Sequence, residues 1–320
     1  MMDNKKMILK EVEKVEVTCL VDNNVDVVLP NTEVARRPVL TRNWYEEPLI
    51  AEHGFCAALT LHIEEGVKHR VLLDSGLDAL AASHNADVLS FDLSNCESLV
   101  SSHGHIDHAG GLLNLRKKMN TVQRIPLLLH EDAFRNRLVK FQDGRAVNLP
   151  APDRSLLTNA GYEIIEKHSA SLQIKDRVLI TGEIPRTNNF EKGFPNHYSE
   201  IEGGKMEADP LIKDDQAIIL TVKDKGLVVI TGCGHAGIIN TLNYAKELTG
   251  EDRILAVLGG MHLSGGIFEP IIPATLQQLE KLKPKFVVPC HCSGLKAVTE
   301  IARKMPLAFI QNSVGTTYSF

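Results

Sequence analysis

The sequence lacks a secretory signal, a membrane-spanning run and a cysteine framework. Residues 1–14 carry repeated lysine and glutamate instead of an apolar core, and no apolar run of about 20 residues occurs elsewhere. Six cysteines are scattered over 320 residues without a CxxC pair, which favours reduced thiols over disulfide bonds. These absences lead us to expect a cytoplasmic protein that does not contact a membrane.

An excess of charge of either sign is also missing. The formal net charge is only −5, so no extended basic surface is implied and nucleic acid is not an expected partner. The hydrophobic share of 43% is ordinary for a globular protein. We therefore expect a small-molecule substrate, while the oligomeric state is left open.

Two parts of the sequence show the same order of predicted elements. Within residues 55–119 and again within residues 217–282, two apolar strands joined by a polar turn precede a helical pattern. A short apolar strand that ends near a histidine follows in both copies, and then a second helical pattern. The first polar turn is predicted at Glu64-Glu65-Gly66. Such matched halves predict an α/β fold with packed sheets and helices outside.

The segment between the two copies, at about residues 135–213, departs from this order. It contains many turn-forming and charged residues, with one strand predicted at residues 178–180 and a long inserted loop at about 183–213. Loops of this length often serve as lids or binding elements, and surface disorder is the alternative. We expect a single domain over residues 1–320 that includes this insertion.

A dense histidine motif, HGHIDH, extends from His103 to His108 directly after an apolar stretch. Residues two apart in extended backbone point to the same side, so His103 and His105 can face one point. Asp107 and His108 lie at the turn into the next helix and can serve a second ion. Imidazole and carboxylate ligands suit zinc first, with iron or manganese as alternatives. An ordinary histidine cluster without metal is the competing interpretation.

Further ligands are needed for a metal pair. His235 in TGCGHAG and His291 in PCHC both follow predicted strand ends, and we predict both as ligands. His262 in GGMHL shares that edge, as a ligand or as a residue that supports the ligands or contacts the substrate. His53 either lines the site or is a solvated loop residue. The remaining histidines are treated as ordinary, with a site role kept open for His130: His62, His69, His84, His130, His168 and His197.

Two further residues occupy equivalent positions in the two copies. Asp74 ends a predicted buried strand in LLDSG, and we expect it to orient a ligand histidine or the metal-binding loop. Cys233 ends the corresponding strand of the second copy. It is interpreted as a small buried thiol, with metal ligation or redox sensitivity as the alternative.

The HxHxDH motif resembles the signature of the metallo-β-lactamase superfamily, and LDSG resembles its first motif. Five further elements, EHGF, SHGH, TGCGHAG, GGMHL and HCSG, are similar to one branch. That branch is known as 7,8-dihydropterin-6-methyl-4-(β-D-ribofuranosyl)aminobenzene 5′-phosphate synthase. The resemblance extends from about Val15 to Gly315. It implies a four-layer αββα sandwich with a binuclear metal site at one edge.

The resemblance also implies which residues hold the two ions. One ion would be held by His103, His105 and His235, and the other by Asp107, His108 and His291. Many members place a bridging aspartate after a glycine where this chain has Gly232-Cys233. The bridging ligand is therefore open, and Asp214 or Asp215 could approach from the preceding strand start.

These observations predict a metal-dependent hydrolase. Two divalent ions would share a hydroxide that attacks an ester, a lactone or a phosphate-containing small molecule, with a pterin-related compound as one candidate. We expect Asp107 to help orient the hydroxide, and His262 or His53 to contact the substrate. A metal-poor binding or signalling protein of the same fold is the alternative, because the bridging aspartate is missing. A flavo-diiron oxidoreductase or a nuclease would need a flavin-binding domain or a basic arm.

Overall fold

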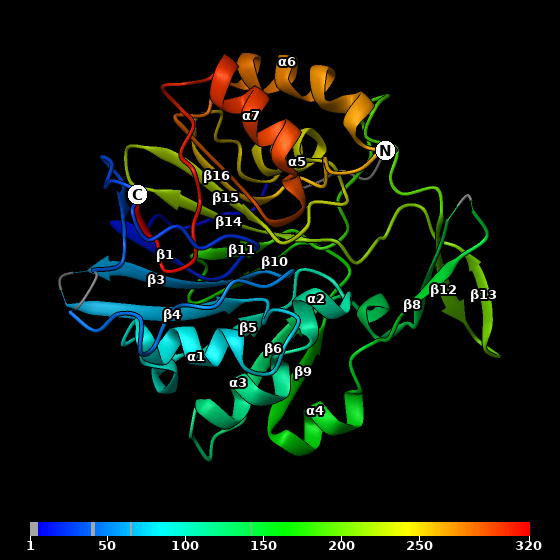
Figure 1. The fold of residues 1–320 in the computed structure, drawn as a ribbon, viewed down its shortest axis with the longest axis horizontal. Coiled ribbons are helices and arrows are strands. Elements are labelled where there is room, and N and C mark those ends of the chain that lie inside the picture. Colours follow the sequence, from blue (N-terminus) through cyan, green and yellow to red (C-terminus); the bar gives the residue numbers. More distant parts are fainter. Residues whose placement is uncertain (1–5, 40–41, 65, 142) are drawn as a thin grey trace.

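Two β-sheets packed face to face form the centre of the molecule, and helices cover both outer faces (Figure 1). The computed structural model describes residues 6–39, 42–64, 66–141 and 143–320. The predicted turn at Glu64-Glu65-Gly66 includes Glu65, which lies outside the described residues, as do residues 1–5 of the N-terminal segment. Within the described part of the chain, no helix has both the length and the apolar character of a membrane span.

The first sheet has eight strands and the second has six. In spatial order, the first sheet contains β2 (Ala35–Arg36), β18 (Thr317–Ser319), β1 (Lys14–Val21), β3 (Cys56–Glu64), β4 (Val67–Leu73), β5 (Ser98–Val100), β6 (Ile125–Leu129) and β9 (Tyr162–Glu166). The second contains β10 (Ser171–Gln173), β11 (Val178–Ile180), β14 (Ala217–Val222), β15 (Gly226–Thr231), β16 (Ile254–Gly260) and β17 (Phe286–Cys290). The two predicted hairpins are thus confirmed as β3–β4 and β14–β15.

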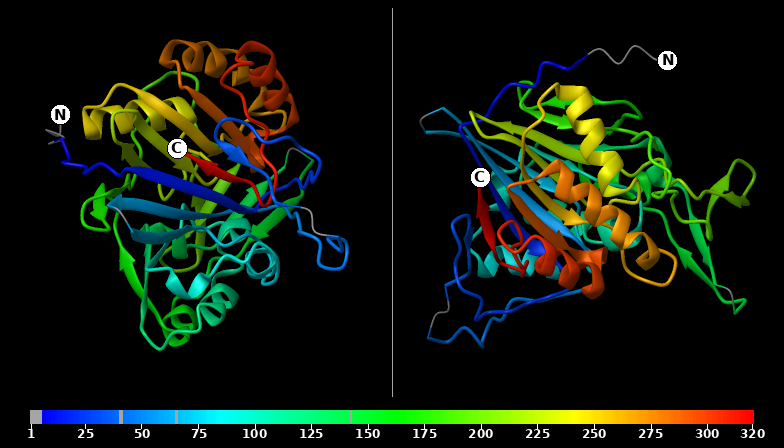
Figure 2. Two further views of the ribbon diagram at one scale, coloured as in Figure 1. Left: turned by 90° about the vertical axis from the view of Figure 1, so that its left-hand side faces the viewer. Right: turned by 90° about the horizontal axis from the view of Figure 1, so that it is seen from above.

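Helices form the two outer layers. Against the first sheet lie α1 (Ala81–Val88), α3 (Leu112–Lys118) and α4 (Arg154–Ala160), with the short α2 (Ile106–Ala109) at the sheet edge. Against the second sheet lie α5 (Ile238–Thr249), α6 (Ile272–Leu282) and α7 (Leu295–Lys304). Figure 2 shows the same layers from two further directions. The architecture is the four-layer αββα sandwich that was predicted.

Three apolar clusters correspond to the three interfaces between these layers. Strand β15 shows how the sequence builds them, because successive side chains of a strand point to opposite faces. Val228 and Ile230 pack between the two sheets, whereas Leu227 and Val229 pack under the helices of the second outer layer. Every residue of β15 is buried, as expected for a strand covered on both faces.

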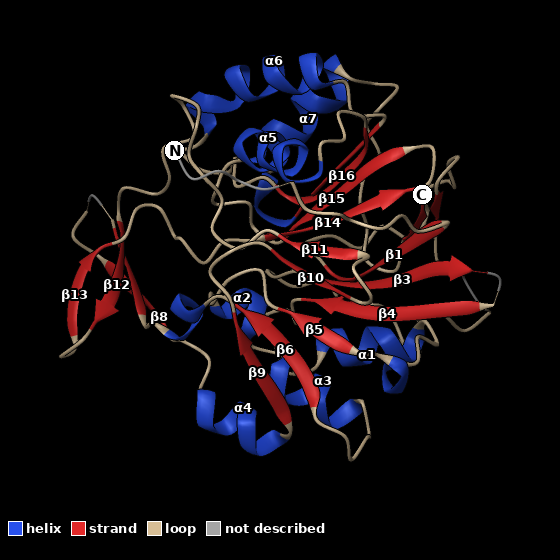
Figure 3. Cartoon of the chain, turned by 180° about the vertical axis from the view of Figure 1, so that it is seen from behind, coloured by secondary structure: helices blue, strands red, loops and turns tan. Residues whose placement is uncertain are grey.

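A third, four-stranded sheet projects from one side of the sandwich (Figure 3). This sheet, called the arm below, contains β7 (Arg137–Lys140), β8 (Ala146–Leu149), β12 (His197–Ile201) and β13 (Lys205–Ala208). The segment at about 183–213 was expected to be a long loop, yet it supplies two of these strands. Most arm positions are partly or fully exposed, so the strands lack the apolar alternation that reveals a half-buried strand.

Candidate metal centre

The loops that carry the histidine motifs meet at one edge of the sandwich. Strands β4, β5 and β6 are parallel to one another, and so are β15, β16 and β17. Parallel strands end at the same edge of their sheet, and loops at that edge are where ligands bind in α/β folds. The HGHIDH motif follows β5, and His235, His262 and His291 follow β15, β16 and β17. Strand geometry therefore brings the motifs together.

The first ligand group consists of three histidines, His103, His105 and His235. Their ring centroids lie 4.5 to 4.9 Å apart, and all three side chains are buried. His103 Nε2 and both ring nitrogens of His235 have no hydrogen-bond partner among the described residues. Burial and nearby imidazole or guanidinium groups lower the pKa of all three rings well below the usual value. Neutral, buried nitrogens without partners fit a metal ion.

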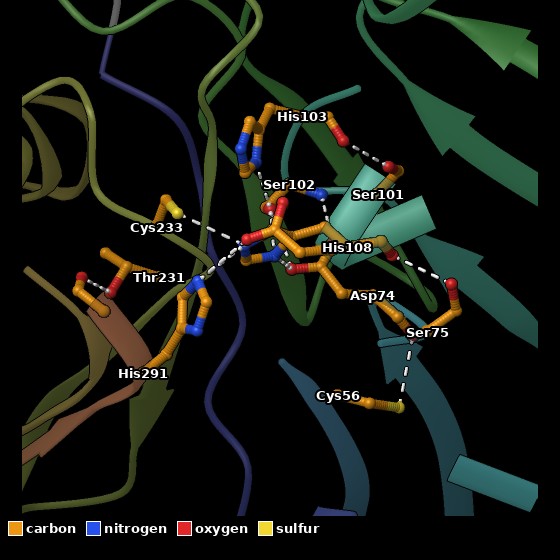
Figure 4. A network of polar contacts seen from close by, with 12 residues as sticks. Cys56, Asp74, Ser75, Ser101, Ser102, His103, His108, Thr231, Cys233 and His291 are labelled. Carbon is orange, nitrogen blue, oxygen red and sulfur yellow. Dashed lines mark hydrogen bonds and ion pairs between the residues drawn. The ribbon is translucent and has the colours of Figure 1, made fainter. Parts of the chain in front are cut away.

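The second ligand group consists of Asp107, His108, Cys233 and His291, whose ligand atoms all lie within 4.8 Å of one another. His108 Nε2 is 3.2 Å from both His291 Nε2 and Cys233 Sγ (Figure 4). Asp107 Oδ2 is 3.3 Å from His291 Nε2. Two nitrogens, a carboxylate oxygen and a sulfur thus face one point, which is a ligand set that suits zinc.

Polar neighbours fix the orientation of these histidines. His108 Nδ1 donates to Asp74 Oδ2 at 2.7 Å, and His291 Nδ1 donates to Asn23 Oδ1 at 3.2 Å. Both rings therefore turn Nε2 toward the common point. Asp74 also accepts from Ser102 N and Ser102 Oγ at 2.6 and 2.7 Å. It has the orienting position predicted from the sequence, and its positive φ of 61° shows that the chain holds a strained backbone there.

The charges in the second ligand group favour a cation at its centre. Burial alone would lower the pKa of His108, yet the carboxylates of Asp74 and Asp107 outweigh it and raise that pKa to about 9. Burial would raise the pKa of Asp107, yet His108 and His291 hold it well below its usual value. The two carboxylates thus favour positive charge at this point.

Cys233 belongs to both ligand groups. Its sulfur lies within 4.8 Å of ligand nitrogens of His103 and His235 and also completes the second group. It therefore stands between the two groups, which fits the metal ligation that was kept as the alternative to a small buried thiol. The two candidate bridging aspartates support the loops instead: Asp214 accepts from Gly104 N at 2.8 Å, and Asp215 accepts from Ala236 N at 2.8 Å.

His53 and His262 lie at the margin of the centre. His53 Nε2 is 3.8 Å from Asp107 Oδ2, and its side chain is 66% exposed. The ring of His262 packs against His235 at 4.1 Å and against Phe268 at 4.3 Å, measured between centroids. Both residues are positioned to meet a molecule that approaches the two ligand groups from outside.

Two residues at the centre were not predicted as part of it. His197, treated as ordinary from the sequence, extends from arm strand β12 and places Nε2 3.0 Å from His105 Nε2. Its Nδ1 donates to the carbonyl of Asp209 at 2.9 Å, so Nε2 presents its lone pair to His105. Cys292 lies with its sulfur 3.4 Å from Cys233 Sγ. The HCSG element contains Cys292, whereas no motif surrounds His197.

The other histidines remain outside both ligand groups. His62 and His69 pair with Glu16 and Glu97, and the ring of His84 contacts the carbonyl of Pro48. The ring of His130 accepts from the backbone N–H of Asp132, and the side chain of His168 is exposed.

Comparison with known proteins agrees with this geometry. Residues 54–248 match the family model described as the metallo-beta-lactamase superfamily. The chain belongs to this superfamily. A solved metal-dependent hydrolase of the β-lactamase superfamily, Tm1679, has a TM-score of 0.69 at 24% identity, and the match covers 95% of this chain and 98% of that one.

Two curated relatives come from Methanocaldococcus jannaschii. One is named 7,8-dihydropterin-6-methyl-4-(beta-D-ribofuranosyl)-aminobenzene-5′-phosphate synthase and is 28% identical over 262 residues, which are 79% of this chain and 85% of the relative. The other is an uncharacterised protein, 29% identical over 266 residues, which are 83% of this chain and 93% of the relative. This metallo-β-lactamase-fold chain is therefore similar to the branch that its sequence motifs resemble.

Proposed function

We propose that this protein is a metal-dependent hydrolase that uses two divalent ions to cleave an ester or phosphate bond of a small molecule. Zinc is the preferred candidate for both ions. The observation that carries the proposal is the arrangement of buried nitrogens and one shared sulfur in the two ligand groups. When bound, the ions would act as Lewis acids and make a water molecule acidic enough to serve as the nucleophile near neutral pH.

The ligands divide between two positions. We assign His103, His105 and His235 to one ion and Asp107, His108 and His291 to the other. Cys233, whose sulfur lies close to ligand atoms of both groups, would take the place between the ions. A thiolate in that place favours zinc over manganese, because soft sulfur ligands bind zinc more readily than the harder ion.

The open side of the centre supplies the groups that handle water and substrate. The Asp107 carboxylate stays ionised and is 17% exposed, so it can accept a hydrogen bond from the attacking water and orient it. Burial and the neighbouring His291 lower the pKa of His53, so this ring is neutral near pH 7 and can hydrogen-bond to an oxygen of the substrate. We assign His262 the corresponding role on the other side.

A pocket of about 210 Å³ lies beside the first ligand group. His235 and His262 form its inner wall, Phe190 and Phe268 supply apolar surface, and Lys192 adds a positive charge. Ligand pockets are usually about 300 to 1,000 Å³, so this one fits a single ring or phosphate group of a larger substrate. Together with the name of the archaeal relative, this lining makes a pterin-type phosphate compound the first substrate to test.

Metal analysis combined with a substrate panel tests the proposal. Purified protein loaded with zinc, manganese or iron should be assayed on phosphodiesters, phosphomonoesters, lactones and thioesters, with a pterin phosphate included. We expect His103→Ala and Asp107→Ala to bind less metal, because each substitution removes a ligand. We also expect the turnover rate of each variant to fall at least about 100-fold. His168→Ala, which changes an exposed histidine that belongs to neither group, should leave both unchanged.

Two results would contradict the proposal. Wild-type protein that binds no divalent ion would favour the alternative of a binding or signalling protein of the same fold. Hydrolysis that survives unchanged in His103→Ala and Asp107→Ala would show that these residues do not form the reactive centre.

A further inference from the structure

A pair of thiols lies beside the two ligand groups. Cys233 follows β15 and Cys292 follows β17, and these two strands are separated by β16. The two sulfurs are nevertheless only 3.4 Å apart, and Cys292 Sγ is 3.2 Å from the carbonyl oxygen of Cys233. Both side chains are buried. The two sulfur atoms are thus in contact although β16 lies between the strands that precede them.

Gly260, the last residue of β16, makes this contact possible. A Cβ atom on Gly260 would lie 2.4 Å from Gly232 O, 2.9 Å from Cys292 Sγ and 3.0 Å from Cys233 Cα. Real Cβ contacts under 3.0 Å are essentially never seen, so any side chain at this position would displace the backbone before Cys233 and the Cys292 sulfur. Glycine in a strand often marks such a close approach. Three neighbouring strands therefore cooperate to bring the sulfurs together.

His262 completes a triangle with the two sulfurs. One ring nitrogen of His262 lies within 4.8 Å of both Cys233 Sγ and Cys292 Sγ. Its Nδ1 is buried and has no hydrogen-bond partner among the described residues. The backbone of His262 has a φ of 43°, which is uncommon for a residue with a side chain. The chain thus accepts local strain where this imidazole is presented to the thiol pair.

We propose that Cys233, Cys292 and His262 form a third metal position, which takes one thiophilic divalent ion such as Zn²⁺ or Cd²⁺ in addition to the two ions of the proposed hydrolytic centre. Two thiolates on a tetrahedral zinc ion, with Zn–S bonds of about 2.3 Å, lie about 3.8 Å apart. The observed 3.4 Å requires a movement of only a few tenths of an ångström. In the metal-free protein this ion displaces the two thiol protons to solvent; when Cys233 is already a ligand of the other two ions, its sulfur is shared and only the Cys292 proton is released.

Three protein ligands leave one coordination position open, as in catalytic rather than structural zinc sites. His262 also lines the pocket of about 210 Å³, so one of the three ligands lies beside the place assigned to the substrate. The ring nitrogen of His262 that does not bind the ion can still donate to a substrate oxygen. The third position would therefore place an additional cation next to a phosphate group in the pocket.

Cadmium titration of the full-length, metal-free protein in the presence of a phosphine reductant tests this position without reference to activity. Bound cadmium is counted by elemental analysis, and sulfur-to-cadmium charge transfer is followed by ultraviolet absorption. We expect three equivalents and an absorption from two thiolates in the wild type. Cys292→Ser should bind one equivalent fewer and lose the absorption that arises with that equivalent. His262→Gln should weaken the third equivalent at least tenfold and leave the other two.

Cys290→Ser is the matched control, because the Cys290 thiol contacts the carbonyl of Val288 and packs between the two sheets. It should behave as the wild type. His103→Ala should lose an equivalent while it keeps the part of the absorption that depends on Cys292, which separates this position from the hydrolytic centre. Two equivalents in the wild type, or unchanged stoichiometry and absorption in both Cys292→Ser and His262→Gln, would overturn the proposal.

Discussion

Arg137 and Asp214 form a buried ion pair that joins the arm to the metal-binding loop. Arg137 Nη2 is 2.6 Å from Asp214 Oδ2, and the two side chains are 1% and 0% exposed. The same carboxylate oxygen accepts from Gly104 N, between two predicted ligands, while Asp214 Oδ1 has no partner among the described residues. Arg137→Met would leave this carboxylate buried with one backbone donor, which should lower the free energy of unfolding by about 3–5 kcal/mol.

Urea unfolding of the metal-free protein, followed by circular dichroism, measures this change. Arg135→Met is the matched control, because Arg135 pairs with Asp132 at 2.7 Å while its side chain is 44% exposed. Loss of such a surface pair should cost only about 0–1 kcal/mol. Arg137→Met/Asp214→Asn should recover part of the loss, since a neutral amide still accepts from Gly104 N without leaving a charge buried.

The reasoning would be refuted in either of two cases. One is an Arg137→Met variant that is no less stable than Arg135→Met. The other is a double variant that is no more stable than Arg137→Met. A second measurement follows from the contact with Gly104: zinc affinity should fall in Arg137→Met and stay unchanged in Arg135→Met.

Three further predictions concern metal binding. His197→Ala should weaken zinc binding while the exposed His168→Ala does not, because His197 Nε2 faces His105; equal dissociation constants for the two variants would exclude a role for His197. Asp74→Asn should weaken zinc binding about 10–100-fold, because His108 loses its orienting carboxylate; unchanged binding in a competition assay would contradict this. Zinc must displace the proton of His108, whose pKa is raised from 6.5 to about 9, and the thiol proton of Cys233, whose pKa is raised by burial. Affinity measured by calorimetry should then rise by at least about tenfold per pH unit between pH 7 and 8, and a flat profile there would show that no proton is displaced.

The parts of the fold that the sequence predicted are those that local patterns determine. The hairpins β3–β4 and β14–β15 and the helices α5 and α6 follow from apolar periodicity within short windows. The HGHIDH motif was informative for the same reason, because six consecutive residues carry four of the predicted ligands.

What the sequence did not predict depends on contacts between distant residues. Arm strand β12 pairs with β7, about sixty positions earlier. Neither strand can therefore be predicted from the residues next to it in the sequence. His197, the first residue of β12, reaches the centre through its contact with His105. Asp214 and Asp215 follow one another in the chain, yet they bind different loops, and only the side-chain directions reveal this. A search for sequence motifs detects neither the pairing of distant strands nor the direction of a side chain.

The second ligand group draws on both halves of the duplicated chain. His108 precedes α3 of the first half, and His291 follows β17 of the second, 183 positions away. An ion bound to both would cross-link the two halves as a disulfide does, and closing a loop of such length lowers the conformational entropy of the unfolded chain by an amount equivalent to about 5 kcal/mol at 25 °C. Metal supply would then control how often the sandwich separates and shows its inner apolar faces to proteases. Metal binding would then also determine how long the protein survives proteolysis.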